Sequence, residues 1–150
     1  MLKLNRLAVA ACALAAGVLL LSAIPAQAQG PRYLLALSDL RTARDYIQSD
    51  HRHEFEHERH RAVDEINKAI DEVKHAAWDD GKQTKYAPPP HPDSDPWHPM
   101  REAIRWLDEA HQHVTEGPDR PENGGLRERA VIHIDEARHS IEEVIRLQGR

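Results

Sequence analysis

The chain has few of the residues that usually build thiol chemistry or a bulky core. Its 150 residues include one cysteine, one phenylalanine, three tyrosines and three tryptophans. A core with so few aromatic side chains must be aliphatic and rich in alanine, which suits closely packed helices better than a sheet. No segment alternates apolar and polar residues with a period of two, so we expect no strand.

The chain also lacks an excess of positive charge, with 20 Lys and Arg against 25 Asp and Glu. This balance argues against a nucleic-acid partner, because such proteins need a basic surface. The sequence contains no G-x-S-x-G, P-loop or H-E-x-x-H motif and no C-x-x-C-H haem attachment motif. We therefore expect a non-enzymatic protein without a resident cofactor.

The first 28 residues have the features of a signal peptide. Lys3 and Arg6 precede an almost wholly apolar run over residues 7–24, and Ala26-Gln27-Ala28 is a small-x-small cleavage site. Cleavage after Ala28 would make Gln29 the first residue and place the protein in the periplasm or outside the cell. The alternative is an uncleaved membrane anchor.

Cleavage would also change the composition of the exported chain. Two of the 20 basic residues, Lys3 and Arg6, would be lost, which leaves 18 against 25 acidic residues and a net charge near −7. Cys12 would be lost as well, so the exported chain would have no disulfide and no cysteine-based metal site. No membrane span would remain.

Apolar residues recur at helical spacing in two pairs of segments. In the first helix of each pair, an offset of 67 places Ala36, Leu40, Ala43 and Ile47 on Ala103, Leu107, Ala110 and Val114. In the second helix, an offset of 68 places Ala62, Val63, Ile66 and Ala69 on Ala130, Val131, Ile134 and Ala137. Two segments that repeat in the same order indicate a duplicated helical hairpin.

Proline, glycine and other turn-forming residues indicate the domain organisation. We expect one helical domain over 29–150, with hairpin one at about 31–80, a proline-rich linker at about 82–96 and hairpin two at about 96–148. Pro31 and Pro96 are expected at the first positions of the first and third helices, and residues 49–56 should connect the helices of hairpin one. Four short amphipathic helices must bury their stripes against one another, which predicts an all-α four-helix bundle of two repeated antiparallel hairpins. Pairing of hairpins between two chains, giving a homodimer, is the alternative.

The segment Gly124-Gly125-Leu126-Arg127-x-x-Ala130-x-x-x-Ile134-x-x-Ala137, with a weaker partner at Arg59, resembles an uncharacterised family of exported bacterial helical proteins. In that family, glycines, His-Arg and an Ala/Ile helix follow an Ala/Leu helix. Here Leu126 stands at the position of the histidine. The resemblance implies export and helical hairpins, and it implies no activity.

Histidine is the unusual component, with 11 residues. The densest group is His51, His53, His57 and His60. On one helix, His53, His57 and His60 would share a face, and neutral imidazoles at that spacing suit Zn²⁺, Ni²⁺ or Cu²⁺. That face points away from the Ile66 stripe, so a solvated polar surface is the competing interpretation.

Three further polar residues fall beside or within the predicted core stripes. Arg59 and Arg127 occupy the same repeat position, and an inward guanidinium needs a partner. Each arginine either caps backbone carbonyls or pairs with a carboxylate at the hairpin end, which would hold the turn, or it belongs to a pair of anion-binding sites. His111 lies at the edge of the third stripe, where a bond to a neighbouring carboxylate is the simplest interpretation and a metal or haem ligand is the alternative.

The sequence thus predicts a periplasmic or secreted, non-enzymatic helical bundle that binds a protein or a small ligand. The alternative function is binding or buffering of a divalent transition metal through the His51–His60 cluster.

Overall fold

The computed structural model describes residues 30–79, 98–117 and 125–149. Over these ranges the chain forms α1 (Gly30–Ser49), the short 3-10 helix η2 (His53–Phe55), α2 (Glu56–Asp79), α3 (Pro99–Thr115) and α4 (Leu126–Gln148), with no strand. The predicted all-α four-helix bundle is confirmed. The predicted signal peptide and linker lie outside the described residues.

The helix boundaries follow local backbone chemistry. The first connection, residues 50–55, falls within the predicted 49–56. The predicted start of the third helix at Pro96 is wrong, because α3 begins at Pro99 and His98 before it is not helical. A residue that precedes proline is driven away from helical angles, so a helix cannot easily pass through His98 into Pro99.

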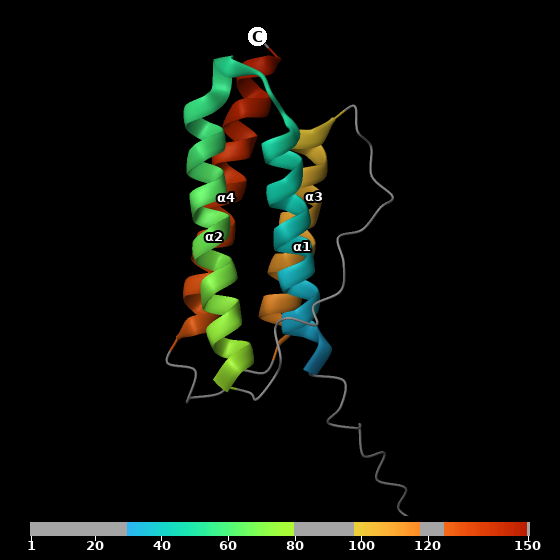
Figure 1. Cartoon of the computed structure of the whole chain (residues 1–150), viewed down its shortest axis with the longest axis vertical. Coiled ribbons are helices and arrows are strands. Elements are labelled where there is room, and N and C mark those ends of the chain that lie inside the picture. Colours follow the sequence, from blue (N-terminus) through green and yellow to red (C-terminus); the bar gives the residue numbers. More distant parts are fainter. Residues whose placement is uncertain (1–29, 80–97, 118–124, 150) are drawn as a thin grey trace, which may run out of the picture.

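The four helices pack as two antiparallel pairs. Figure 1 shows α1 beside α3 on one side of the bundle and α2 beside α4 on the other, and these two pairs make the most extensive contacts. Each helix therefore packs mainly against its counterpart in the other half of the sequence. The end of α1, the start of α2, the start of α3 and the end of α4 lie together, and we call this region the turn end (Figure 1).

The predicted apolar stripes form the core. Ile66 and Ile134 have no exposed surface, and the alanines that the two offsets relate are at most 1% exposed. Burial of each large aliphatic side chain contributes roughly 1.5–3 kcal/mol, while the alanines let the helices approach closely. The buried apolar residues of the four helices are Tyr33, Ala36, Leu37, Leu40, Ala43, Ile47, Ala62, Ile66, Ala69, Ile70, Val73, Ala76, Ala77, Met100, Ala103, Trp106, Leu107, Ala110, Val114, Leu126, Ala130, Ile134, Ala137, Ile141 and Val144.

Helix α1 also buries polar side chains that the stripe does not include. Ser38, Asp39 and Thr42 are each almost fully buried. The Thr42 hydroxyl donates to the Ser38 carbonyl at 2.8 Å, so its polar atom is satisfied within the helix. Asp39 lies 2.8 Å from Nδ1 of His113 on α3, which links the two helices of this pair.

None of the helices in the described ranges is long and apolar enough to cross a membrane.

Candidate functional site

The connection between α1 and α2 is held by one buried carboxylate. Asp50 is 5% exposed, and its Oδ1 accepts hydrogen bonds from the Arg52 backbone N–H at 3.0 Å and from Arg52 Nε at 2.9 Å. Its Oδ2 accepts further bonds from the same guanidinium. Such a charge-assisted fork is among the stronger side-chain interactions in proteins, so it fixes the direction in which the chain enters α2.

The charges around Asp50 favour its ionised form. The hydrogen bonds from the Arg52 side chain lower the pKa of Asp50, and they outweigh burial, which acts to raise it. The positive charge of Arg59 adds a smaller lowering of the same pKa. Asp50 therefore connects electrostatically to two arginines on different parts of the turn end.

The predicted histidine cluster does not keep a common helical face. His53 belongs to η2, whereas α2 begins at Glu56, so His53 leaves the helical register of His57 and His60. All four side chains of the cluster are exposed, and His51 lies in the chain before both η2 and α2. Nε2 of His60 lies 3.8 Å from Oε1 of Glu56.

No group of three or more His, Cys, Asp or Glu side chains within 30–79, 98–117 and 125–149 is arranged to hold a metal ion. The exposure of the cluster agrees with the solvated-surface interpretation. Metal binding by His51, His53, His57 and His60 stays a prediction.

Arg59 lies at the first turns of α2 and is half-buried. Its Nε atom is buried and has no hydrogen-bond partner in the part of the chain that the structure describes. The expected capping contact is therefore not made by Nε, and the nearby carboxylate of Asp50 interacts with Arg59 through charge alone. Arg127, its counterpart, is half-buried at the start of α4, at the opposite end of the bundle (Figure 1). The two arginines therefore do not form one site.

A cleft of about 240 Å³ lies between the end of α1 and the start of α2. Three residues that the sequence singled out, His51, Arg59 and His60, line it together. Ile47, Gln48 and Val63 complete its wall. We call it the Arg59 cleft.

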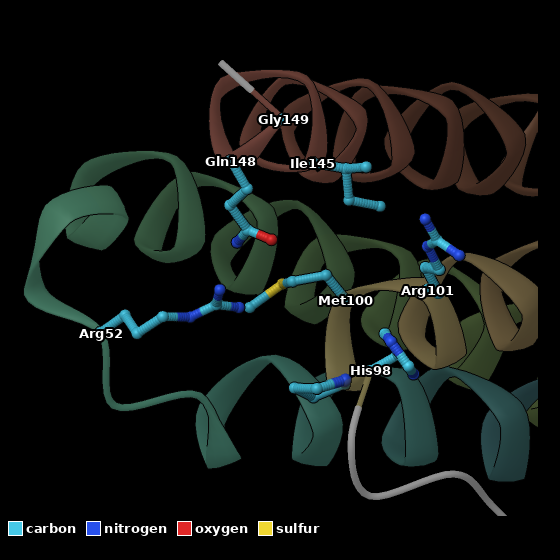
Figure 2. Close-up of a pocket in the computed structure, with 8 residues that line it drawn as sticks. Arg52, His98, Met100, Arg101, Ile145, Gln148 and Gly149 are labelled. Carbon is cyan, nitrogen blue, oxygen red and sulfur yellow. The ribbon is translucent and has the colours of Figure 1, made fainter.

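A second cleft of about 240 Å³ lies at the same end of the bundle, between the turn, the start of α3 and the end of α4. In Figure 2, Arg52 extends from the turn towards Met100, and Gln148 reaches from α4 towards them. Arg101 makes no ion pair within the described residues. We call this the Arg52 cleft, and its lining residues are Arg52, His98, Pro99, Met100, Arg101, Ile145, Gln148 and Gly149. Sequence reasoning missed it, because no motif connects three segments so far apart in the chain.

Histidines also make contacts between helices away from the turn end. His111 is half-buried with Nε2 3.9 Å from Oδ1 of Asp135, which agrees with its interpretation as a boundary residue near a carboxylate. Nδ1 of His133 on α4 lies 2.7 Å from Oε2 of Glu65 on α2. Burial acts to raise the pKa of Glu65, but hydrogen bonds from Lys68 and His133 lower it overall. These contacts hold the bundle together and place no ligand group in either cleft.

No family model matches the chain, and neither a curated protein nor a solved structure matches it. The resemblance to exported bacterial helical proteins therefore stays a prediction from the Gly124–Ala137 motif.

Proposed function

We propose that the protein is an exported, non-enzymatic binding protein that takes its ligand at the turn end of the bundle. One observation supports this proposal above others. Two clefts flank the Asp50–Arg52 turn, and each is lined by arginine and histidine side chains in a chain that is acidic overall. Local positive charge in an acidic protein attracts a negatively charged ligand while the remaining surface repels it.

The turn connects the two clefts physically. Arg52 lines one cleft and is held by Asp50, while Arg59 lines the other and lowers the pKa of Asp50. A ligand that binds to either arginine would therefore change the electrostatic surroundings of Asp50. Binding at one cleft should influence the other through this shared carboxylate.

Export to the periplasm or beyond the cell remains part of the proposal, on the strength of residues 1–28. A protein partner or a second copy of the chain is an alternative ligand. Two large apolar side chains would be available to it, since Trp78 is 77% exposed and Ile132 is 56% exposed. The acidic balance of the chain speaks against nucleic acid.

The test is a thermal-shift screen of the tag-free protein against small anionic, neutral and cationic compounds. A ligand present at 100 times its Kd should stabilise the bundle by about 2.7 kcal/mol, which corresponds to a rise in Tm of roughly 5–15 °C for a domain of this size. The proposal expects anionic compounds to dominate the hits. A screen in which anionic and cationic compounds shift Tm equally would contradict it.

Metal binding is the second candidate function. His57, His60, Asp64 and Glu65, all residue types that bind transition metals, line one groove on α2 together with Arg61 and Lys68. Within the described residues no three of them are placed to hold one ion, so a metal would have to draw them together. A true site predicts that Zn²⁺, Ni²⁺ or Cu²⁺ binds with defined stoichiometry near neutral pH, and that binding weakens below about pH 6 as imidazoles are protonated.

Calorimetric titration of the tag-free protein separates the two interpretations of the histidines. Replacement of His53, His57 and His60 together by Ala should abolish metal binding, while His111→Ala should leave it unchanged. A solvated histidine surface instead predicts weak binding at several sites that declines gradually with each histidine removed.

A further inference from the structure

Arg59 presents an energetic problem that the described residues do not solve. Its Nε atom is buried and lacks a hydrogen-bond partner in the described chain. A buried donor without a partner costs about 1–3 kcal/mol, and more when it carries charge. Native structures keep few such groups, and an ion or water bound at the group is one of the recognised reasons for keeping one.

The carboxylate that could neutralise Arg59 is already bonded to another arginine. Asp50 lies within electrostatic reach of Arg59, but both of its oxygens accept hydrogen bonds from Arg52. None of the six residues that line the Arg59 cleft carries a negative charge, and three of them, His51, Arg59 and His60, are basic. The cleft therefore has donors and no internal acceptor of matching charge.

The rest of the lining indicates the form of the missing ligand. Ile47 and Val63 contribute apolar wall, and Gln48 contributes an amide. The cleft volume of about 240 Å³ is smaller than the roughly 300–1,000 Å³ typical of drug-sized ligands. Such a space suits a charged head group with a short apolar part.

We propose that the Arg59 cleft binds the oxyanion head, carboxylate or phosphate, of a small molecule. The Arg59 guanidinium is the principal donor, because its planar fork matches both head groups. His51 and His60 flank the anion, while Ile47 and Val63 contact the apolar part. This assignment rests on the proposed function and narrows it to one cleft and one ligand chemistry.

The first experiment compares the unfolding of Arg59→Met and Arg61→Met in Tris buffer with chloride as the added anion. Arg61 is an exposed arginine on the same helix, so both variants lose one positive charge; Arg61→Met also loses an exposed ion pair with Glu136 on α4, which is worth less than about 1 kcal/mol. Arg59→Met keeps an apolar side chain of similar length and removes the guanidinium whose Nε lacks a partner in the described residues. Relief of this buried donor should offset the loss of the attraction between Arg59 and Asp50, so the Tm should fall no further than that of Arg61→Met. A clearly larger fall than that of Arg61→Met would overturn the proposal, because it would show that Arg59 makes stabilising contacts within the protein.

The second experiment titrates the same three proteins with sodium phosphate and with sodium isobutyrate in a calorimeter. Arg59→Met should weaken binding of the preferred probe about tenfold or more, which is the expected effect of losing a charge-assisted hydrogen bond. Arg61→Met should change it by less than about twofold, as for an exposed charge. Tighter binding of isobutyrate would identify a carboxylic acid as the ligand class, and tighter binding of phosphate would identify a phosphorylated one.

The other outcomes separate this inference from the proposed function. Binding that is equal in all three proteins but lost in Arg52→Gln or Arg101→Gln overturns the inference and keeps a ligand at the turn end, in the Arg52 cleft. No binding of either probe at millimolar concentration also overturns the inference. If the broader compound screen then yields no anionic hits, the proposed function fails with it.

Discussion

Replacement of Asp50 by Asn is the most informative single change at the turn end. Asn keeps the size of the side chain and one acceptor oxygen, so the bond from the Arg52 backbone N–H can survive. The charge-assisted fork to the Arg52 guanidinium is lost. Because Asp50 is almost fully buried, water cannot easily replace what the fork provided.

Hydrogen bonds that involve a charged group are worth about 1.5–3 kcal/mol, so Asp50→Asn should lower the free energy of unfolding by that amount. For a domain of this size, the Tm should fall by roughly 3–18 °C. Asp45→Asn, on the last turns of α1 just before Asp50, provides the matched control, since the Asp45 side chain is 59% exposed and lies 3.9 Å from Arg44. Its effect should stay below about 0.5 kcal/mol.

The pKa of Asp50 adds a second signature. It is lower in the folded protein than the usual value near 3.8, because of the Arg52 hydrogen bonds. A lowered carboxyl pKa stabilises the fold at pH values above the unfolded pKa, and this stabilisation disappears as the pH falls through the folded pKa. The difference between the unmodified protein and Asp50→Asn should thus be full at neutral pH and shrink below about pH 4.

Urea unfolding at neutral pH and at about pH 3 measures both effects. If the difference in unfolding free energy between the unmodified protein and Asp50→Asn is the same at both pH values, Asp50 is not the ionised centre of the turn. Equal stability of Asp50→Asn and Asp45→Asn at neutral pH would refute the fork as a stabilising contact.

Two further predictions concern the core and export. Ile66→Asp or Ile134→Asp, at sites with no exposed surface, should each cost more than about 4 kcal/mol and unfold much of the bundle, whereas Ile132→Asp on the exposed side of α4 should not. Circular dichroism melts of the three variants test this, and unchanged midpoints in both buried variants would contradict the core assignment. N-terminal sequencing of exported protein should begin at Gln29, and retention of residues 1–28 would favour a membrane anchor instead.

The sequence predicted the core well because helical periodicity does not depend on how helices are arranged. Every residue of the predicted first stripe, from Tyr33 to Ile47, is buried. The same periodicity could not reveal Asp39, since its burial depends on the histidine that α3 places beside it. Nor could it identify Pro99 as the first residue of α3, because Pro96 satisfies the same local rule and only the backbone restriction on His98 separates the two.

The histidine cluster shows a different limit of sequence reasoning. A common face for His53, His57 and His60 requires a continuous helix, and the spacing itself carries no sign of an interruption. The chain forms a 3-10 turn at His53–Phe55 before α2 begins, and the fork between Asp50 and Arg52 precedes that turn. The Asp50–Arg52 contact that holds Arg52 at one cleft is therefore followed directly by the break in helical register within the histidine cluster.

Arg59 and Arg127 show why equivalent sequence positions need not have equivalent functions. Both lie in the first turns of the second helix of a hairpin, and a helical wheel assigns them the same inward direction. Their surroundings differ because different connections precede them: a buried carboxylate and its arginine before α2, and Gly125 with a left-handed φ of 78° before α4. The connection before α2 thus places a buried carboxylate beside the cleft that Arg59 lines. We therefore expect Asp50→Asn to change the affinity of Arg59 for anions, because the residue near Arg59 becomes uncharged and loses its fork with the Arg52 guanidinium. The contribution of Arg127 to stability, at the opposite end of the bundle, should not change. The same change in anion affinity should be measured for Asp50→Asn in a protein that already carries Arg59→Met. An equally large change there would show that the turn acts on the ligand by some route other than Arg59.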